Sequence, residues 1–391
     1  MAKELAFALI NPYTIAKSRT GGVIARFFSR TGLELVAARM FGPCRELAER
    51  FAALVREDPE TDPGFADLLA DYVLRSYSPD PATGRRRRVM MLLFEGEDAI
   101  AKVDKATGRI RYSATAGDTI RATYGDFIQD ESGGVRYFEP AVLIGRDAAS
   151  TRRTLQLWAE FSGRDGGLIE GAADLAADTG DAKKIQETLV LIKPDNFRFP
   201  SARPGNIIDH FSASGLRIIG AKVHCMTGEE AEEFYGPVRA VLRGKLVGAV
   251  GARAKKALTA ELGFEIPDQV ARVVGEALGP VYGDYQFYQI IQFMTGCWVP
   301  SCTPEQKRKP GKERCMALVY AGLNAVEKIR SILGPTDPSK AQPGSVRREF
   351  GQDVMVNAAH ASDSPENAAR EMKIIRVEQD MIREWVKQYY P

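Results

Sequence analysis

The segment Asn-Ala-Ala-His-Ala-Ser-Asp at residues 357–363 carries the side chain best suited to chemistry, the imidazole of His360. This segment follows an apolar run, and so does Lys193 in the sequence Lys-Pro-Asp. A neutral imidazole can attack a phosphoryl group, and fixed cations beside it can stabilise the charge on the phosphoryl oxygens. If neighbouring strand ends bring His360 and Lys193 into one cleft, the pair favours phosphoryl transfer through a phosphohistidine.

Three further side chains can complete such a site. Arg330 and Arg347 add cations, and Thr336 in Gly-Pro-Thr-Asp-Pro adds a hydroxyl. The chain contains no Gly-x4-Gly-Lys-Ser/Thr loop, so P-loop chemistry is unsupported. It also shows no acidic cage that would hold a metal ion.

The sequence repeats itself, and the repeat predicts two copies of one fold. Segments 4–13, 21–41, 92–103 and 118–127 recur as segments 187–195, 204–224, 318–329 and 344–351. A residue that is reactive in one copy and inert in the other is not required by the fold. The inert counterparts lie in the first copy, where Asn11 aligns with Lys193, Asp104 with Arg330, Ile110 with Thr336, and Ile144 with His360.

Other alignments favour structural roles. Arg121 aligns with Arg347 and Asp147 with Asp363, so Arg347 can serve the fold as well as a ligand. The two remaining histidines, His210 and His224, align with phenylalanines of the first copy and are interpreted as structural.

The predicted elements of the second copy follow the order strand, helix, strand, strand, helix, strand. We expect strands at residues 188–192, 216–224, 315–320 and 353–359. We expect helices from residue 204, from the Thr227 capping box, over residues 324–333 and from Pro365. This order predicts an α+β fold, a four-stranded antiparallel sheet with helices on one face, and the first copy follows the same order.

The 391 residues suit two domains rather than one. We expect a first copy at residues 1–161, a Gly-, Ala- and Asp-rich linker at 162–185 and a second copy at 186–391. Insertions at 238–286 and 298–312 belong to the second copy alone, and the former suggests two added helices. The net charge of +2 does not indicate a nucleic acid or an anionic membrane as partner.

The five cysteines form no zinc pattern, and the apolar stretch at residues 5–10 is too short for a signal peptide or a membrane span. We therefore expect a cytoplasmic protein.

The second copy resembles the nucleoside diphosphate kinase family from Glu187 to about Ile375. The resemblance rests on TLVLIKPD, GLRIIGAK, NAVEKIRSILGPTDP, PGSVRREFG and NAAHASDSPENAAREM. It implies two tandem ferredoxin-like domains, and a transfer of the γ-phosphate from nucleoside triphosphates to nucleoside diphosphates. It further implies that Mg²⁺ arrives with the nucleotide.

The resemblance also assigns roles to residues. His360 would be phosphorylated, Ser362 and Glu371 would orient its ring, and Tyr235 would lie beside it. Substrate contacts would come from Lys193, Asn357, Arg330, Thr336 and Arg347 on ribose and phosphates, and from Phe287 and Ile291 on the base. The insertion at 238–286 separates Tyr235 from Phe287 by far more than the family's usual short gap.

Two alternatives to a kinase remain, a non-catalytic nucleotide-binding or scaffold protein, and a phosphohistidine donor to another protein. For the assembly, we expect an intramolecular pseudo-dimer in which the first copy is a degenerate partner of the second. Two whole chains can in addition pair as a homodimer, which is the alternative assembly that we expect.

Overall fold

The computed structural model describes residues 3–58, 63–110, 117–172 and 185–391. They form two compact units, one of residues 1–224 and 316–391 and one of residues 225–315. The first unit contains the strands and most helices of both copies. Each unit is described by itself below.

The sheet of the first copy has the strand order β2-β3-β1-β6. Its strands are β1 (Glu4–Ile10), β2 (Glu34–Phe41), β3 (Val89–Gly96) and β6 (Val142–Ile144). Its helices are α1 (Pro12–Ala16), α2 (Thr20–Thr31), α3 (Arg45–Arg56), α4 (Pro63–Tyr77), α5 (Ala99–Thr107), α6 (Ile120–Tyr124) and α7 (Ala148–Asp165). The pairs β1–β3, β1–β6 and β2–β3 are antiparallel, as predicted.

The sheet of the second copy repeats this topology in the order β10-β7-β9-β8. Its strands are β7 (Ile185–Ile192), β8 (Arg217–His224), β9 (Cys315–Leu323) and β10 (Ala359–Ala361). Helices and 3₁₀ turns of this copy in the first unit are η3 (Pro194–Asn196), α8 (Arg203–Ser212), α12 (Ala325–Leu333), η5 (Pro338–Lys340), α13 (Val346–Phe350), α14 (Pro365–Ile374) and α15 (Met381–Tyr389). With the fourth strand of each copy beside the first, both sheets have the ferredoxin-like strand order, which confirms the predicted fold class.

Helices cover both faces of the first sheet, whereas we expected them on one face. Alternate residues of β1 belong to two separate cores, Ala6, Ala8 and Ile10 to one, and Leu5, Phe7 and Leu9 to the other. The first core contains residues of α2 and α5, and the second contains residues of α3, α4, α7 and α15. Since β1 is apolar on both faces, both must be covered.

The fourth strand of the second copy is shorter and lies later than we predicted, at residues 359–361 instead of 353–359. Two features stop an extended chain before it. The Asp353 carboxylate accepts hydrogen bonds from the backbone N–H groups of Met355 and Val356, which makes a turn. Ala358 then has a φ of +69°, in the left-handed region that strands do not use. His360 therefore lies inside the strand rather than after it.

The first copy has a β-hairpin that the second copy lacks and that the sequence pattern did not indicate. Strands β4 (Asp126–Gln129) and β5 (Val135–Glu139) pair antiparallel between α6 and β6. At its base, Glu139 accepts hydrogen bonds from the buried hydroxyl of Tyr72 and from Asn11 Nδ2, the latter at 3.4 Å. Burial raises the pKa of Glu139 to about 7.

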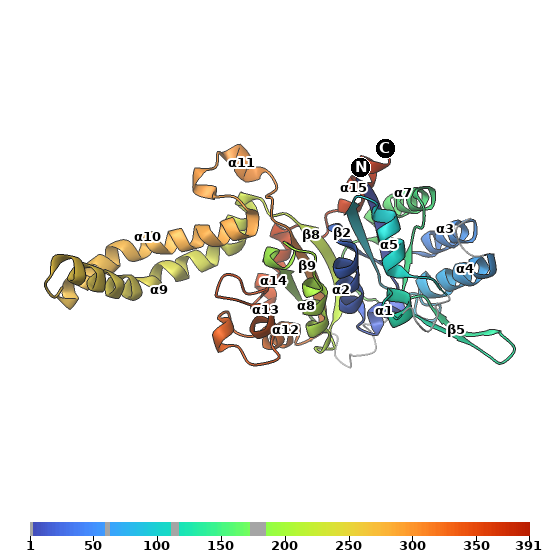
Figure 1. Cartoon of the computed structure of the whole chain (residues 1–391), viewed down its shortest axis with the longest axis horizontal. Coiled ribbons are helices and arrows are strands. Elements are labelled where there is room, and N and C mark those ends of the chain that lie inside the picture. Colours follow the sequence, from blue (N-terminus) through green and yellow to red (C-terminus); the bar gives the residue numbers. More distant parts are fainter. Residues whose placement is uncertain (1–2, 59–62, 111–116, 173–184) are drawn as a thin grey trace. The chain divides into compact units, whose positions relative to one another are not determined.

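The two copies pack directly against each other inside the first unit. Helix α2 contacts α8, and edge strand β2 lies beside β8 (Figure 1). The helices approach so closely that a Cβ on Gly21 would lie 2.5 Å from the carbonyl oxygen of Gly205, and a Cβ on Gly205 would lie 2.2 Å from the backbone nitrogen of Ala25. One core runs through both copies, from Phe27 of α2 to Phe211 of α8.

The C-terminal segment crosses from the second copy to the first. Two buried cations at equivalent positions of β2 and β8 hold its backbone. Arg39 donates to the carbonyl oxygens of Glu378 and Gln379, and Lys222 donates to those of Ile375 and Arg376. Helix α15 then packs on α7, with Ile382 and Val386 buried in the core of the first copy.

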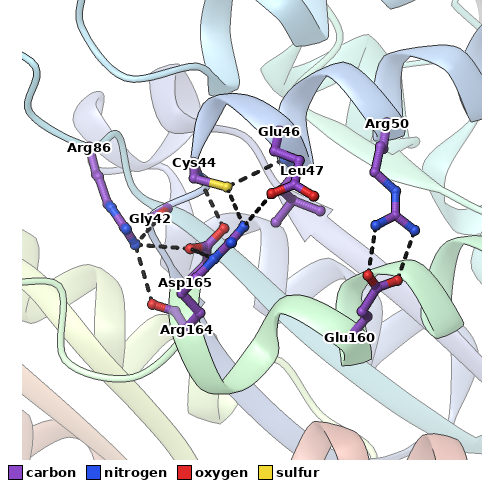
Figure 2. Close-up of polar contacts among 9 residues, drawn as sticks. All are labelled: Gly42, Cys44, Glu46, Leu47, Arg50, Arg86, Glu160, Arg164 and Asp165. Atoms are coloured by element: carbon purple, nitrogen blue, oxygen red, sulfur yellow. Dashed lines mark hydrogen bonds and ion pairs between the residues drawn. The ribbon is translucent and has the colours of Figure 1, made fainter.

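A polar junction joins the start of α3 to the end of α7 (Figure 2). The buried carboxylate of Asp165 accepts from the backbone N–H of Cys44 at 3.0 Å and from Arg86 at 3.1 Å. Further along the same helices, Arg50 and Glu160 form two parallel hydrogen bonds of 2.7 and 2.8 Å. The junction fixes α3 against α7 on the outer face of the first sheet.

The second unit is built on a long helical hairpin, α9 (Gly228–Leu262) with α10 (Asp268–Thr295), visible in Figure 1. The insertion at 238–286 therefore lengthens two helices rather than adding two. Glycines make their close contact, since a Cβ on Gly275 would lie 2.5 Å from the carbonyl oxygen of Val247. The short elements η4 (Val299–Ser301) and α11 (Pro304–Arg308) follow.

Among the described residues, no helix combines the length and the apolar character needed to cross a membrane.

Candidate functional site

The candidate site is built around His360 in the middle of β10. This strand pairs with β7, where Leu191 lies opposite His360. Ala359 and Ala361 point into the core on one face, so the imidazole points to the other, where α14 packs on β7. About a quarter of the imidazole side chain, 23%, is exposed.

A buried carboxylate on α14 orients the imidazole. Glu371 Oε2 lies 2.9 Å from His360 Nε2 and also accepts a 2.6 Å hydrogen bond from the hydroxyl of Ser362. Glu371 and Ser362 are both buried. An ionised carboxylate only accepts hydrogen bonds, so Nε2 carries the proton and the lone pair lies on Nδ1. The predicted grouping of His360, Ser362 and Glu371 is present in the structure.

Lys193 and Asn357 form a second cluster at the end of β7. Lys193 Nζ donates to Asn357 Oδ1 at 2.6 Å and to the carbonyl oxygen of Met355 at 3.2 Å. Burial, and next the Arg347 guanidinium, lower the pKa of Lys193 to about 8. The backbone N–H of Lys193 donates to the carbonyl oxygen of Ala358, which ties this cluster to the start of β10.

Arg347 has the same backbone partners as its counterpart in the first copy. Its guanidinium donates to the carbonyl oxygens of Gly334 and Ala359 at 3.0 and 3.1 Å. Arg121 donates to the equivalent carbonyl oxygens, those of Gly108 and Val142, at 3.0 and 3.2 Å. The structural role that the alignment suggested for this arginine is therefore present in both copies, as hydrogen bonds to the backbone.

The remaining predicted residues of the second copy's sheet domain are exposed. Arg330 lies at the end of α12 and Thr336 in the loop after it. The carbonyl oxygen of Thr336 accepts from Asn357 Nδ2 at 3.2 Å, which links this loop to the Lys193 cluster.

Three predicted residues belong to the other unit. Tyr235 lies on α9, and Phe287 and Ile291 lie on α10. All three are buried, and the guanidinium of Arg239 lies 5.3 Å from the centre of the Phe287 ring.

Asn196 is a positioning residue that the sequence does not indicate. The buried side-chain amide of Asn196 donates to the carbonyl oxygens of Lys193 and Ala358, so it holds together the ends of β7 and β10. Its oxygen accepts from Arg203 at 3.2 Å. An Asn two residues after a Pro is an ordinary turn residue, and nothing in the sequence distinguishes this one.

The strand register corrects the alignment of the two copies by one residue. Leu9 of β1 pairs with Leu143, and the equivalent Leu191 of β7 pairs with His360. The counterpart of His360 is therefore Leu143, not Ile144. The left-handed residues Ala141 and Ala358, which precede these strands, agree with this register.

The same shift applies to the helix that follows. Asp147 caps α7 and Ser364 caps α14, so Asp147 corresponds to Ser364, not to Asp363. The counterpart of Glu371 is then Thr154.

Within the described residues, no group of three or more His, Cys, Asp or Glu side chains is arranged to hold a metal ion. The cations and amides of the site suit an anionic ligand instead.

The two sheets and the pairing of His360 with the buried Glu371 define a duplicated ferredoxin-like protein with a candidate site for phosphoryl groups. The family model for nucleoside diphosphate kinase matches residues 4–132, 186–241 and 309–381, which lie in both copies and omit most of the long hairpin. These segments cover well over half of the sequence. The chain therefore belongs to the nucleoside diphosphate kinase family.

Relatives of this family match about half of the chain each. A nucleoside diphosphate kinase of Bdellovibrio bacteriovorus is 31% identical over 190 residues, which are 49% of this chain and 92% of that protein. One from Staphylothermus marinus is 30% identical over 200 residues, 51% of this chain and 98% of that protein. The solved structure of an NDP kinase from Pyrobaculum aerophilum is 26% identical, covers 49% of this chain and 94% of that one, and has a TM-score of 0.32.

Proposed function

We propose that this chain is an active nucleoside diphosphate kinase in which His360 carries the phosphoryl group between a nucleoside triphosphate and a nucleoside diphosphate. Family membership supports the class of reaction. The hydrogen bond between His360 Nε2 and the buried carboxylate of Glu371 is the observation that supports His360 as the nucleophile. In this proposal residues 186–391 form the catalytic domain, and residues 1–161 form a degenerate domain joined to it by the linker at 162–185. Residues 173–184 of that linker lie outside the described residues.

The transfer has two half-reactions. In the first, the Nδ1 lone pair of His360 forms a bond to the γ-phosphorus, the bond to the bridging oxygen breaks, and the nucleoside diphosphate leaves with that electron pair. In the second, a terminal oxygen of the acceptor diphosphate attacks the phosphohistidine, and the electron pair of the P–N bond returns to Nδ1. Throughout both half-reactions the Glu371 carboxylate accepts a hydrogen bond from Nε2–H, and it stabilises the positive charge on the phosphorylated ring.

The cations of the site have a defined part in this scheme. Lys193, Arg330 and Arg347 would stabilise the charge on the phosphoryl oxygens, and Thr336 would donate to a phosphate. Asn357 would contact the ribose. Mg²⁺ enters as part of the nucleotide substrate, bound to its phosphates, rather than as an ion that the protein holds.

The residues of the second unit would contact the base. Phe287 and Ile291 would cover it by stacking and apolar contact. Since Arg239 lies over the Phe287 ring, a base that stacks on this face would displace the guanidinium. The proposed location is a reducing cytoplasm, which would keep the five cysteines as the free thiols found in the structure.

Labelling with γ-labelled ATP tests the proposal. The wild-type chain should acquire an acid-labile, alkali-stable label that a nucleoside diphosphate removes. His360→Asn should abolish both the label and turnover. His210→Asn is the matched control, because His210 is also a partly exposed imidazole paired with a carboxylate, Glu349, at 3.0 Å. It should leave both intact.

Each other result contradicts the proposal in its own way. A label that survives His360→Asn would show that another residue is the nucleophile. A label that no nucleoside diphosphate removes would favour a phosphohistidine donor to another protein. Nucleotide binding without a label would favour a non-catalytic binding protein.

A further inference from the structure

The first copy retains a pocket of about 380 Å³ at the position that corresponds to the candidate site of the second copy. The strand register and the sequence repeat identify four lining residues as counterparts of proposed site residues. They are Leu143 for His360, Thr154 for Glu371, Ile110 for Thr336 and Arg121 for Arg347. The first copy therefore keeps a pocket at this position, although the residues proposed for phosphoryl transfer are replaced there.

This pocket cannot transfer a phosphoryl group by the scheme above. A leucine replaces the nucleophile, and a threonine replaces the carboxylate that would orient it. The counterpart of Lys193 is Asn11, whose side chain is engaged with Tyr77 and Glu139. Binding without transfer is the chemistry that remains.

Four arginines line the pocket. Arg109 and Arg146 stand where the second copy has Pro335 and Asp363, whereas Arg153 and Arg121 have arginine counterparts, Arg370 and Arg347. Two carboxylates oppose them, Asp58 in the lining and Asp104 at 3.8 Å from Arg146. Among the described residues, neither Arg109 nor Arg153 is paired with a carboxylate. The lining keeps a net positive charge, which favours an anionic ligand.

The opposite wall of the pocket is apolar. Helix α3 contributes Phe51, Leu54 and Val55, and helix α4 contributes Phe65 and Leu69. A bare phosphate ion would leave this wall in contact with water. A ligand with a flat apolar group and a phosphate fills both parts, and the volume lies in the range of small-molecule sites.

We propose that the first copy binds a nucleoside diphosphate in this pocket as a second, non-catalytic nucleotide site. The arginines hold the phosphates, and the α3–α4 wall contacts the base. The site does not rest on the proposed transfer at His360, since its lining is separate and it needs no nucleophile.

Photolabelling of the full chain with 8-azido-ADP, followed by peptide mapping, tests this site. We expect label within residues 45–77, whose helices form the apolar wall. Arg146→Ala together with Arg153→Ala should reduce this label at least tenfold. Arg152→Ala is the matched control, since Arg152 is an exposed arginine of the same helix that does not line the pocket, and it should leave the label unchanged.

The single variant Arg153→Ala guards against misfolding, because Arg153 is exposed and its replacement leaves the core intact. It should reduce the label by itself. Unlabelled ADP should compete, whereas adenosine and inorganic phosphate at the same concentration should not.

Absence of label in residues 45–77, or label insensitive to the arginine variants, would overturn the proposal. Equal competition by inorganic phosphate would show a plain anion site and would also overturn it. A chain that forms no phosphoenzyme but keeps the photolabel in residues 45–77 would contradict the proposed kinase activity and leave this second site standing.

Discussion

At the scale of single residues, the duplicated chain contains its own control. His360 of β10 and Leu143 of β6 occupy equivalent positions in the two copies, so the fold accepts an aliphatic side chain there. The imidazole and its partner Glu371 are therefore not demanded by packing. Arg347 and Arg121 show the opposite case, because both donate to equivalent backbone carbonyls and the fold uses them alike.

This likeness leads to a prediction on stability. Arg121→Ala and Arg347→Ala should each lower the free energy of unfolding by about 2–4 kcal/mol, since each leaves two carbonyl oxygens without a charged donor. Urea unfolding followed by circular dichroism measures both, with the exposed Arg152→Ala as reference. A cost confined to one of the two variants would show that the shared hydrogen bonds do not stabilise the fold equally.

The pKa of Lys193 predicts a pH dependence of the transfer. Burial lowers this pKa to about 8, so the ammonium loses its charge as the pH rises through that value. We expect kcat/KM to fall above pH 8, since this parameter reports on the free enzyme. Lys193→Arg stays charged and should lose the decline, even if its absolute rate is lower. If kcat/KM of the wild-type chain and of Lys193→Arg declines at the same pH, the titration of another group causes the decline.

At the scale of elements, the β4–β5 hairpin adds a buried acid to the first copy. Glu139 ends β5 and is bonded to Tyr72 of α4 and to Asn11 after β1, so one carboxyl group connects three elements. Burial raises its pKa to about 7, and in the folded state it therefore keeps a proton that the unfolded chain releases.

This buried proton makes the stability of the protein depend on pH. Between pH 4.5 and 7 the folded state binds more protons than the unfolded state, so Glu139 makes stability fall as the pH rises through this window. The loss should reach about 3–4 kcal/mol and level off above pH 7. Glu139→Gln carries no titrating proton and should flatten the decline in urea unfolding at several pH values. An unchanged slope would show that Glu139 is already ionised at acid pH.

Local sequence patterns are enough to predict the boundaries of some elements but not of others. The strand β7, the helix α12 and the Thr227 capping box follow from apolar runs and capping residues close in sequence. The fourth strand does not, because a side-chain turn at Asp353 and a left-handed Ala358 interrupt a run that reads as one strand. Neither feature changes the hydrophobic pattern, so the pattern alone predicts the strand too early in the sequence.

At the scale of the whole molecule, the two copies and the C-terminal segment depend on one another. Helices α2 and α8 touch through glycines, and one core spans both copies. The last helix, α15, buries Ile382 and Val386 against the first copy. Each copy therefore covers apolar surface that the other would expose.

Truncation tests this dependence. Residues 186–391 expressed alone should be poorly soluble or self-associate, because the faces of α8, β8 and α15 lose their partners. The full chain should run near 43.0 kDa in size-exclusion chromatography with light scattering, or as a simple dimer. A stable, monomeric and fully active fragment would show that the first copy is not needed as a partner.

The sequence by itself determined the duplication and the order of strands and helices, which follow from repeated motifs and hydrophobic periodicity, both local properties of the chain. The ferredoxin-like topology and the roles proposed for the site residues came from the resemblance of five sequence motifs to the nucleoside diphosphate kinase family.

Only the tertiary structure decided the one-residue register between the copies, the nitrogen of His360 that keeps its lone pair, and the pocket retained in the first copy. Each of these depends on groups that are distant in sequence and adjacent in space. Strand pairing sets the register, Glu371 on α14 selects the tautomer, and residues of α3, α4 and α7 enclose the pocket. No local pattern contains that information, because it arises only when the elements pack.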